Sequence, residues 1–416
     1  MAYQVLYRTY RPRKFEEVIG QQYIIKTLKN AIKTNKIAHA YLFAGPRGTG
    51  KTTIAKLFAK AINCEDFNEE ACEECKSCVA YKENNHPDII ELDAASNNSV
   101  EQIRDIIDKI PYLPLVGKYK VYIIDEVHML SNSAFNALLK TLEEPPAHVI
   151  FILATTDPQK IIPTVLSRCQ RYNFSKLTTF EIKKRIQEVL TKENIPFEEK
   201  AVEEIARMAE GGMRDGLSIV EQCLSYNPNE LNLEDIEYIF GLLSTGKQLE
   251  LLSNIHDGKT SETIDTLRKM YQSGVDLKRL ALDLIEIIKD VLIFDDKGST
   301  KLLSKLSAAE ASTLLRTISK QDLLKDITEL ESLVDKEKLN QNFLSYFEIA
   351  LIRMSANNQS PERPIESRET TNVSHETIIE KPIVEPIKTQ ESIADKAIRI
   401  AQETISEKKE DVEINI

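Results

Sequence analysis

The chain from residue 3 to about 172 alternates short apolar runs with longer segments whose apolar residues recur at helical spacing. Short runs of this kind are typical of strands in a parallel sheet that is covered on both faces. The candidate strands lie at 41–44, 88–92, 121–124 and 149–153.

The segments between these runs carry the start and stop signals of helices. Ser99 and Gln102 have the spacing of a capping box, and Pro111 ends the helix that follows. An apolar stripe over 134–142 predicts a second helix, which ends before the prolines at 145–146. Strands that alternate with helices predict an α/β fold with right-handed crossovers.

The strand signal fades after Thr178, and helical patterns replace it. Helices are predicted at 180–190, 201–209, 217–224, 233–240, 264–271 and 277–292. A break at Gly241 indicates two helical domains. Beyond about residue 356, prolines lie among Glu, Ser, Thr and Lys, which predicts a flexible tail. Within it, 393–404 could form one short helix, either alone or on a partner.

Charge and hydropathy narrow the functional classes. The 416 residues carry a formal net charge of −11, which argues against coating DNA by bulk charge. A local basic surface is compatible with that total, because nucleic-acid contact depends on where Lys and Arg cluster. No apolar stretch of about 18 residues and no apolar signal core at the N-terminus are present. We therefore expect a cytoplasmic protein.

A complete P-loop pattern follows the first candidate strand, and a helical pattern follows the loop. Its residues are Gly45, Pro46, Arg47, Gly48, Thr49, Gly50, Lys51 and Thr52. The glycines let backbone N–H groups point at phosphate oxygens, and the helix adds its positive N-terminal end. We expect Lys51 to reach the β- and γ-phosphates of ATP and the Thr52 hydroxyl to bind Mg²⁺.

The third candidate strand ends in two acids, Asp125 and Glu126. Such a pair is the second half of a P-loop site. We expect Asp125 to hold Mg²⁺ through water and Glu126 to orient and activate the attacking water. A Glu directly after the metal-binding Asp favours hydrolysis. His128 follows closely, but a lone His beside a site is more often structural, so we assign it no chemistry.

Four of the six cysteines lie close together, at positions Cys64, Cys72, Cys75 and Cys78. Four thiolates within one short segment can close a tetrahedral Zn²⁺ shell, and a reducing cytosol favours a metal over disulfides. The segment has too few apolar residues to bury a core, so a structural metal would replace one. An iron–sulfur cluster and four free thiols are the alternatives.

Longer motifs are specific enough to point to a family. They lie at 6–21, 39–52, 91–96, 124–131, 154–158, 167–169 and 211–215. With these motifs the chain closely resembles the bacterial DNA polymerase III gamma/tau family, the ATPase subunits of the sliding-clamp loader. The resemblance is strong over about 1–240, and the helical region to about 355 resembles the family's collar in pattern only. The four-cysteine segment matches the family's zinc module.

The resemblance implies an AAA+ fold in four parts. A P-loop ATPase core would cover 1–177 and contain the zinc module at 64–78. A helical lid at 178–241, a helical oligomerisation collar at 242–356 and a flexible linker or tail at 357–416 would follow.

The resemblance also implies roles for residues that no sequence pattern identifies by itself. Thr155 or Thr156 falls at the sensor-1 position, and Arg214 falls at sensor 2 on the lid. Arg168 becomes the arginine finger, which reaches the ATP of a neighbouring subunit. Without the family, Arg168 could be a surface arginine and Arg214 could pair with Asp215. The nucleotide base is expected to lie against the N-terminal segment, at Arg8, Tyr10, Arg11, Val18 and Ile19.

The implied function is loading of the sliding clamp onto primed DNA, driven by ATP binding and hydrolysis within the DNA polymerase III holoenzyme. The implied partners are other clamp-loader subunits, including further copies of this chain, the clamp, and primer–template DNA held through its phosphates. The polymerase and the replicative helicase are partners of long family members. Polymerisation would belong to another subunit, although the family is classified with that activity.

Two other interpretations stay open at this point. The first is another AAA+ machine, such as a Holliday-junction helicase motor or a eukaryotic-type clamp-loader small subunit. The four cysteines and the Ser-Arg-Cys motif disfavour it. The second is a scaffold that binds ATP with negligible hydrolysis, which the intact pair of Asp125 and Glu126 disfavours.

Overall fold

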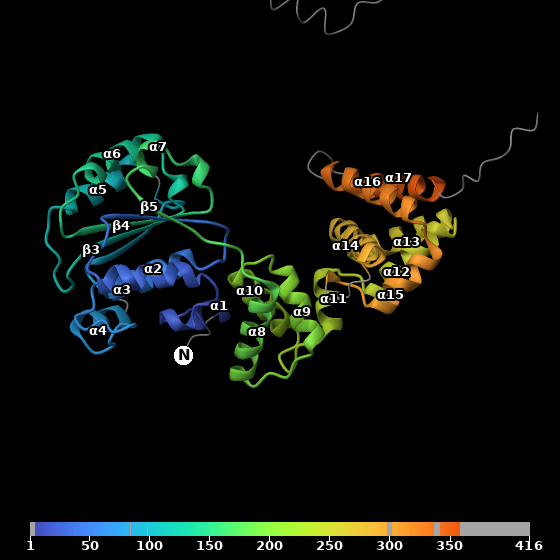
Figure 1. Ribbon diagram of the computed structural model, residues 1–416, viewed down its shortest axis with the longest axis horizontal. Helices are drawn as coiled ribbons and strands as arrows, with labels where there is room; N and C mark the ends of the chain where they lie inside the picture. The colour runs from blue at the N-terminus through green and yellow to red at the C-terminus, as the bar shows by residue number, and fades with distance from the viewer. Residues whose placement is uncertain (1–4, 84, 98, 298–301, 337–341, 358–416) are drawn as a thin grey trace, which may run out of the picture. The chain divides into compact units, whose positions relative to one another are not determined.

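The computed structural model describes residues 5–357, with gaps at 84, 98, 298–301 and 337–341 (Figure 1). The predicted tail at 357–416, with its helix at 393–404, lies outside the described residues except for Asn357, which ends helix α17 (Phe343–Asn357).

A sheet of five parallel strands, in the order β2-β3-β4-β1-β5, forms the N-terminal part of the chain. The strands are β1 (Ala40–Ala44), β2 (Ile89–Asp93), β3 (Lys120–Asp125), β4 (Val149–Thr155) and β5 (Gln170–Asn173). The first four confirm the predicted strands and the α/β fold. The sequence pattern missed β5, because this edge strand buries only Tyr172 and exposes its polar residues.

Helices cover both faces of the sheet (Figure 1). α2 (Gln22–Lys33) and α3 (Lys51–Ile62) pack with Tyr41 and Phe43 on one face. α5 (Val100–Lys109) and α6 (Asn132–Glu143) pack with Leu42 on the other. The helix predicted after Ser99 is confirmed, and its capping box with Gln102 is present. Short helices complete this part: α1 (Leu6–Thr9), η1 (Phe15–Glu17), α4 (Lys76–Lys82), η2 (Val127–Met129), η3 (Pro158–Lys160) and α7 (Pro163–Leu166).

The strand register brings three loops to one edge of the sheet. Ala44 at the end of β1 pairs with Thr155 at the end of β4. Asp125 ends β3, the other neighbour of β4. Because parallel strands end at the same edge, the segments that follow β1, β3 and β4 meet there, which is where open α/β sheets bind ligands.

The rest of the described chain is helical, as predicted. Its helices are α8 (Thr179–Glu193), α9 (Glu199–Met208), α10 (Met213–Tyr226), α11 (Leu233–Phe240), α12 (Thr245–His256), α13 (Thr260–Gln272), α14 (Leu277–Lys297), α15 (Ala308–Thr317), α16 (Lys320–Lys336) and α17 (Phe343–Asn357). Two separate apolar clusters lie in 177–236 and 243–354. Gly241 ends α11 with φ +60, and a side chain there would lie 2.2 Å from the carbonyl oxygen of Gly274. The clusters agree with a lid and a collar, whose boundaries stay a prediction.

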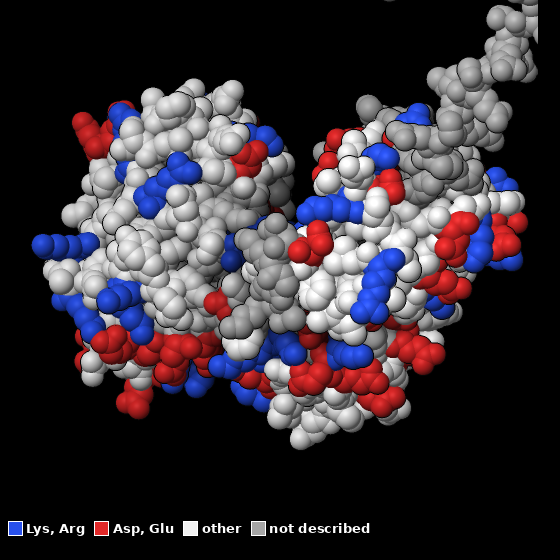
Figure 2. Space-filling view, turned by 45° about the vertical axis from the view of Figure 1, so that its right-hand side comes forward, with Lys and Arg blue, Asp and Glu red and all other residues white. Residues whose placement is uncertain are grey.

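Charge and hydropathy of the folded chain add two observations. Figure 2 shows Lys and Arg interspersed with Asp and Glu on the visible face. Within the described residues, the structure has no helix that is both long and apolar enough to cross a membrane. The cytoplasmic location stays a prediction.

A buried carboxylate anchors the loop between α5 and β3. Asp88 is 1% exposed and accepts the backbone N–H groups of Leu115, Val116 and Gly117 at 2.7, 2.7 and 2.8 Å. Asp88→Ala would leave these three donors without their acceptor. Hydrogen bonds to a charged group contribute about 1.5–3 kcal/mol each, but water can reach the exposed Leu115 and Val116, so we expect urea unfolding to show a free energy of unfolding that is lower by about 3 kcal/mol.

The matched control for this prediction is Asp108→Ala, which removes an exposed carboxylate from α5. We expect the free energy of unfolding of this variant to stay within about 0.5 kcal/mol of that of the unsubstituted chain. Equal losses for the two variants would show that the Asp88 hydrogen bonds do not stabilise the fold.

Candidate functional site

The loop at 45–50 joins β1 to α3 and uses backbone conformations that favour glycine. Gly48 has φ +75, and a side chain there would lie 2.9 Å from the Cα atom of Gly212. Gly50 is the N-cap of α3, with φ +99 and open space beside it. Glycine at these two positions allows a left-handed backbone without a side chain beside it, as a phosphate-binding loop requires.

The other loop residues hold its shape or face outward. Gly45 N–H donates to the carbonyl oxygen of Thr155 at 3.1 Å, which ties the loop to β4. Thr49 is buried, and its hydroxyl donates to the carbonyl oxygen of Pro46 at 2.8 Å. The side chain of Arg47 is exposed.

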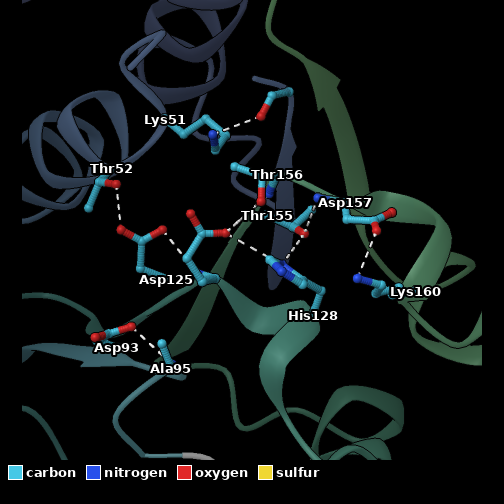
Figure 3. A network of polar contacts seen from close by, with 12 residues as sticks. Lys51, Thr52, Asp93, Ala95, Asp125, His128, Thr155, Thr156, Asp157 and Lys160 are labelled. Atoms are coloured by element: carbon cyan, nitrogen blue, oxygen red, sulfur yellow. Dashed lines mark hydrogen bonds and ion pairs between the residues drawn. The ribbon is translucent and has the colours of Figure 1, made fainter. Parts of the chain in front are cut away.

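Lys51 lies under this loop. Its side chain is buried, and Nζ donates to the carbonyl oxygens of Gly45 and Pro46, both at 2.8 Å (Figure 3). Burial lowers the pKa of the Lys51 ammonium, and the charges of Glu126 and Asp125 oppose that shift. The loop thus holds a cation at its centre, ready to neutralise phosphate charge.

Thr52 and Asp125 form the second contact across the site. The Thr52 hydroxyl donates to Asp125 Oδ2 at 2.6 Å, and Asp125 Oδ1 accepts the N–H of Glu126 at 3.0 Å (Figure 3). A hydroxyl and a carboxylate at hydrogen-bond distance are oxygen donors of the kind that Mg²⁺ prefers. These residues therefore fit a magnesium site.

Glu126 is held in place by the end of β4. Its φ of +46 is unusual for a residue with a side chain, and such strain concentrates at functional sites. Glu126 Oε2 accepts the backbone N–H of Thr156 at 3.3 Å and its hydroxyl at 3.0 Å (Figure 3). A carboxylate fixed in this way beside a phosphate loop can serve as a general base.

His128 belongs to the same network, which the sequence did not reveal. Its ring Nδ1 lies 3.4 Å from Glu126 Oε2 and 3.0 Å from Thr155 Oγ1. The fully buried Thr155 hydroxyl also accepts the N–H of Asp157 at 3.0 Å. The available signal was the position of His128, two residues after Glu126 and on the short helix η2. The two threonines thus differ: Thr156 faces Glu126, whereas Thr155 faces His128.

The two predicted arginines lie in different surroundings. Arg168 donates to the carbonyl oxygen of Thr164 at 2.6 Å and pairs with Glu143 at 2.6 Å, and its side chain is 31% exposed. Arg214 lies over the ring of Tyr7, with its guanidinium carbon 4.8 Å from the ring centroid. The residue before it, Met213, donates its N–H to the carbonyl oxygen of Gly48 at 3.0 Å, which places the start of α10 against the loop.

Asp215, the alternative partner of Arg214, lies near a second arginine in the structure, Arg47. Asp215 Oδ1 lies 3.9 Å from Arg47 Nε.

Among the residues expected at the nucleotide base, Arg11 donates to the Thr53 hydroxyl on α3 at 3.2 Å. Arg8 lies over the Tyr7 ring at 5.9 Å. Val18 is buried in the cluster that contains α3, and Tyr10 and Ile19 pack against the lid cluster.

The four cysteines converge as predicted. Their Sγ atoms lie within 4.8 Å of one another. A Zn²⁺ ion at about 2.3 Å from each thiolate would separate the sulfur atoms by about 3.8 Å, so the cluster fits that ion. Backbone N–H groups donate hydrogen bonds to the sulfur atoms; for example, the N–H of Cys72 donates to Cys64 Sγ at 3.3 Å. Hydrogen bonds from the N–H groups of Glu74 and Cys75 lower the pKa of the Cys72 thiol to about 7, whereas burial raises the pKa of the Cys64 and Cys78 thiols.

The chain is similar to known proteins in both sequence and fold. Three family models match consecutive parts of the chain: "DNA polymerase III, delta subunit" at 20–178, "DNA polymerase III clamp loader subunit, ATPase lid domain" at 181–228 and "DNA polymerase III subunits gamma and tau domain III" at 231–367. DNA polymerase III subunit gamma of Buchnera aphidicola subsp. Baizongia pistaciae is 37% identical over 303 residues, which cover 73% of this chain and 82% of that protein. This chain belongs to the DNA polymerase III gamma/tau family.

The family prediction is thereby confirmed, and longer relatives extend the comparison. DNA polymerase III subunit tau of Bacillus subtilis is 44% identical over 359 residues, which cover 85% of this chain. This gamma/tau chain spans 63, 43 and 51% of the lengths of three tau or tau/gamma relatives. Among solved structures, the RuvB Holliday junction branch migration motor of Thermotoga maritima aligns with a TM-score of 0.42 and 20% identity, covering 64% of this chain and 86% of that one.

Proposed function

We propose that this gamma/tau chain is the ATPase subunit of a bacterial sliding-clamp loader, which uses ATP to load the clamp onto primed DNA within the DNA polymerase III holoenzyme. One observation carries the proposal. Lys51 under the glycine loop, Thr52 bonded to Asp125, and Glu126 held by Thr156 meet at one edge of the sheet. On one chain, this set supplies the phosphate-binding lysine, the Mg²⁺ ligands and the general base of ATP hydrolysis.

The loop at 45–50 and Lys51 would hold the phosphates of ATP, and Thr52 with Asp125 would hold Mg²⁺. The ion, when bound, would neutralise charge on the phosphate oxygens. Glu126 would accept a proton from the attacking water. The pair of Asp125 and Glu126 favours an ATPase over a scaffold that binds ATP without hydrolysis.

We assign the sensor-1 role to Thr156 in preference to Thr155. Both the backbone N–H and the hydroxyl of Thr156 contact Glu126, so a change at the phosphates can reach the catalytic carboxylate through this residue. Thr155 is turned toward His128 and the loop after β4. Thr155 would then support the sensor strand, and His128 would position Glu126.

The cysteine cluster would bind Zn²⁺ in a structural role. Cys64, Cys72, Cys75 and Cys78 would fill the four positions of a tetrahedral shell, which leaves no open position for catalysis. The ion would then fold a segment that lacks an apolar core.

The remaining proposed roles belong to the two arginines at the nucleotide and to the surfaces that bind partners. Arg214 would contact the nucleotide of its own subunit, because α10 begins against the loop. Arg168 would serve a neighbouring subunit. The proposed partners are other clamp-loader subunits, further copies of this chain, the clamp, and primer–template DNA. The collar would hold the subunits together, and polymerase and replicative helicase would bind through longer forms of the family.

Arg168→Ala tests the shared site. In the reconstituted loader with clamp and primed DNA, we expect hydrolysis to fall by about 10³-fold or more, since an arginine finger supplies that much in other NTPases. ATP affinity of the isolated chain should not change, because Arg168 pairs with Glu143 at the surface of its own subunit. The measurement is steady-state ATPase activity together with equilibrium nucleotide binding.

Arg171→Ala is the matched control, since it removes another exposed arginine nearby. A mixing experiment then tests action between subunits. Loaders assembled from Arg168→Ala and Lys51→Ala chains together would contain some sites with both groups intact, and their activity should exceed that of either variant alone. Undiminished hydrolysis by Arg168→Ala, or no recovery on mixing, would contradict the finger.

A further inference from the structure

The N-terminal strap, residues 6–18, links the two parts of the proposed nucleotide site. At one end, Leu6 N–H donates to Glu221 on α10 at 2.5 Å, and Tyr7 and Tyr10 pack against the lid cluster. At the other end, Phe15 is buried in the cluster that contains α2 and α3. The strap thus depends on both clusters for its position.

The strap also carries the residues proposed to contact the base. Arg11 donates to Thr53, two residues beyond Lys51, at 3.2 Å. Arg8 shares the ring of Tyr7 with Arg214. A displacement of the strap would therefore move the base contacts, whereas the phosphate loop is also held by its own hydrogen bonds, such as Thr49 to Pro46 and Lys51 to Gly45.

The short helix η1 fixes the sheet-side end of the strap, and a distant residue caps it. The N-cap residue, Lys14, makes no side-chain cap hydrogen bond. Glu70 supplies the cap instead. Its Oε2 accepts the N–H of Phe15 at 3.0 Å, and its Oε1 accepts the N–H of Glu16 at 3.2 Å. Amides at a helix start have no partner within the helix, so an acceptor there stabilises it.

The Glu70 carboxylate is held firmly. Lys29 on α2 donates to Oε1 at 2.9 Å, and the side chains of Lys29 and Glu70 are only 17% and 20% exposed. The Lys29 ammonium also lies 5.5 Å from the ring centroid of Phe15. One carboxylate therefore joins α2, η1 and the cysteine segment.

Glu70 belongs to the cysteine segment, two residues before Cys72. Two further ion pairs fasten this segment to the ATPase core: Glu69 with Lys33 on α2, and Glu73 with Lys60 on α3. Because the segment has few apolar residues, its order depends on the four thiols. The position of Glu70 therefore depends on the state of the cysteine cluster.

We propose that Glu70 is a positioning residue for the nucleotide base, through which the cysteine segment sets the N-terminal strap. The proposal rests on the proposed ATP site and names a determinant of its base specificity. A metal bound by the four cysteines would strengthen ATP binding at a distance, because it orders the segment that caps η1. If Glu70 only stabilised the fold, its substitution would instead weaken the binding of ATP and of other phosphate ligands by the same factor.

The experiment compares two ligands on the full chain. ATP has both base and phosphates, whereas inorganic tripolyphosphate has only phosphates. In Glu70→Gln, the side-chain amide would bring an N–H donor toward the N–H groups of Phe15 and Glu16 and the ammonium of Lys29, which are donors themselves. We therefore expect the Kd for Mg²⁺–ATP to rise about tenfold, because the loss of a helix cap has an effect of this size. The Kd for tripolyphosphate should stay within about twofold. Hydrogen exchange at the amides of Phe15 and Glu16 should accelerate.

Glu65→Gln is the matched control, since it makes the same chemical change at an exposed position of the segment. Glu70→Asp provides a milder second variant, which keeps the charge but withdraws the carboxylate by one methylene group. It should weaken ATP binding by a smaller factor. Removal of metal from the unsubstituted chain by a chelator should reproduce the selective loss of ATP affinity.

Three results would overturn the inference: unchanged ATP affinity in Glu70→Gln and Glu70→Asp, an equal loss for ATP and tripolyphosphate, or unaltered hydrogen exchange at η1. An unsubstituted chain that binds neither ligand would instead refute the proposed function, and the inference with it. The two failures are therefore distinguishable.

Discussion

Lys51→Ala is expected to abolish clamp loading and to lower ATP hydrolysis by at least about 10²–10³-fold, the loss seen when one group that stabilises transition-state charge is removed. The amine is the buried cation of the loop, and it lies 2.8 Å from the carbonyl oxygens of Gly45 and Pro46. On nucleotide binding it would exchange these acceptors for phosphate oxygens. The measurement is ATP turnover and clamp loading by the reconstituted loader.

The stability of this variant separates function from folding. Burial disfavours the Lys51 ammonium and lowers its pKa, which offsets part of the loss of its two hydrogen bonds, so we expect the nucleotide-free variant to stay folded, as thermal unfolding would show. Lys56→Ala is the matched control, because Lys56 lies on the same helix and pairs with Glu91 away from the loop. We expect this control to keep its ATPase activity within about twofold. A Lys51→Ala chain that still loaded clamps would refute the proposed function.

Glu126→Gln is expected to separate ATP binding from hydrolysis. The glutamine amide oxygen can still accept the Thr156 hydroxyl, which lies 3.0 Å from Glu126 Oε2, but the amide cannot accept a proton from water. We therefore expect the Kd for ATP to change little and the turnover to fall by about 10²–10⁴-fold, the range of general-base catalysis. Equilibrium binding and single-turnover hydrolysis would measure the two effects.

Glu144→Gln is the control for this variant, since Glu144 is an exposed carboxylate at the end of α6. We expect it to hydrolyse ATP at the unsubstituted rate. A Glu126→Gln chain with unchanged turnover would assign the base to another residue, and His128, 3.4 Å from Glu126, would be the next candidate.

Buried elements could be predicted well from the sequence, and exposed ones poorly. β1, β3 and β4 are apolar along nearly their whole length because helices cover both sheet faces, and that pattern is readable in one chain. β5 is an edge strand that buries one residue in four, so it has no apolar run to detect. Its place beside β1 is decided by pairing with a segment more than a hundred residues away.

The candidate site shows the same division. Lys51, Thr52, Asp125 and Glu126 were predicted because the phosphate loop and the strand-end acids have local patterns. The contacts of His128 and Thr156 with Glu126 were not predictable, because they depend on how β3 and β4 lie side by side. The ring of Tyr7 beside Arg214 depends likewise on packing between the N-terminus and α10.

Local sequence patterns specify the chemistry available to this protein: a glycine loop with its lysine, an acid pair at a strand end, and four cysteines in one segment. These features are local, since a loop conformation, a strand end or a metal cluster needs only residues close in the chain. Which distant groups meet depends on the fold, as Glu70 at the first amides of η1 and Thr156 at Glu126 illustrate. Such contacts follow from sheet order and helix packing, in which each position is set by the summed burial of many side chains.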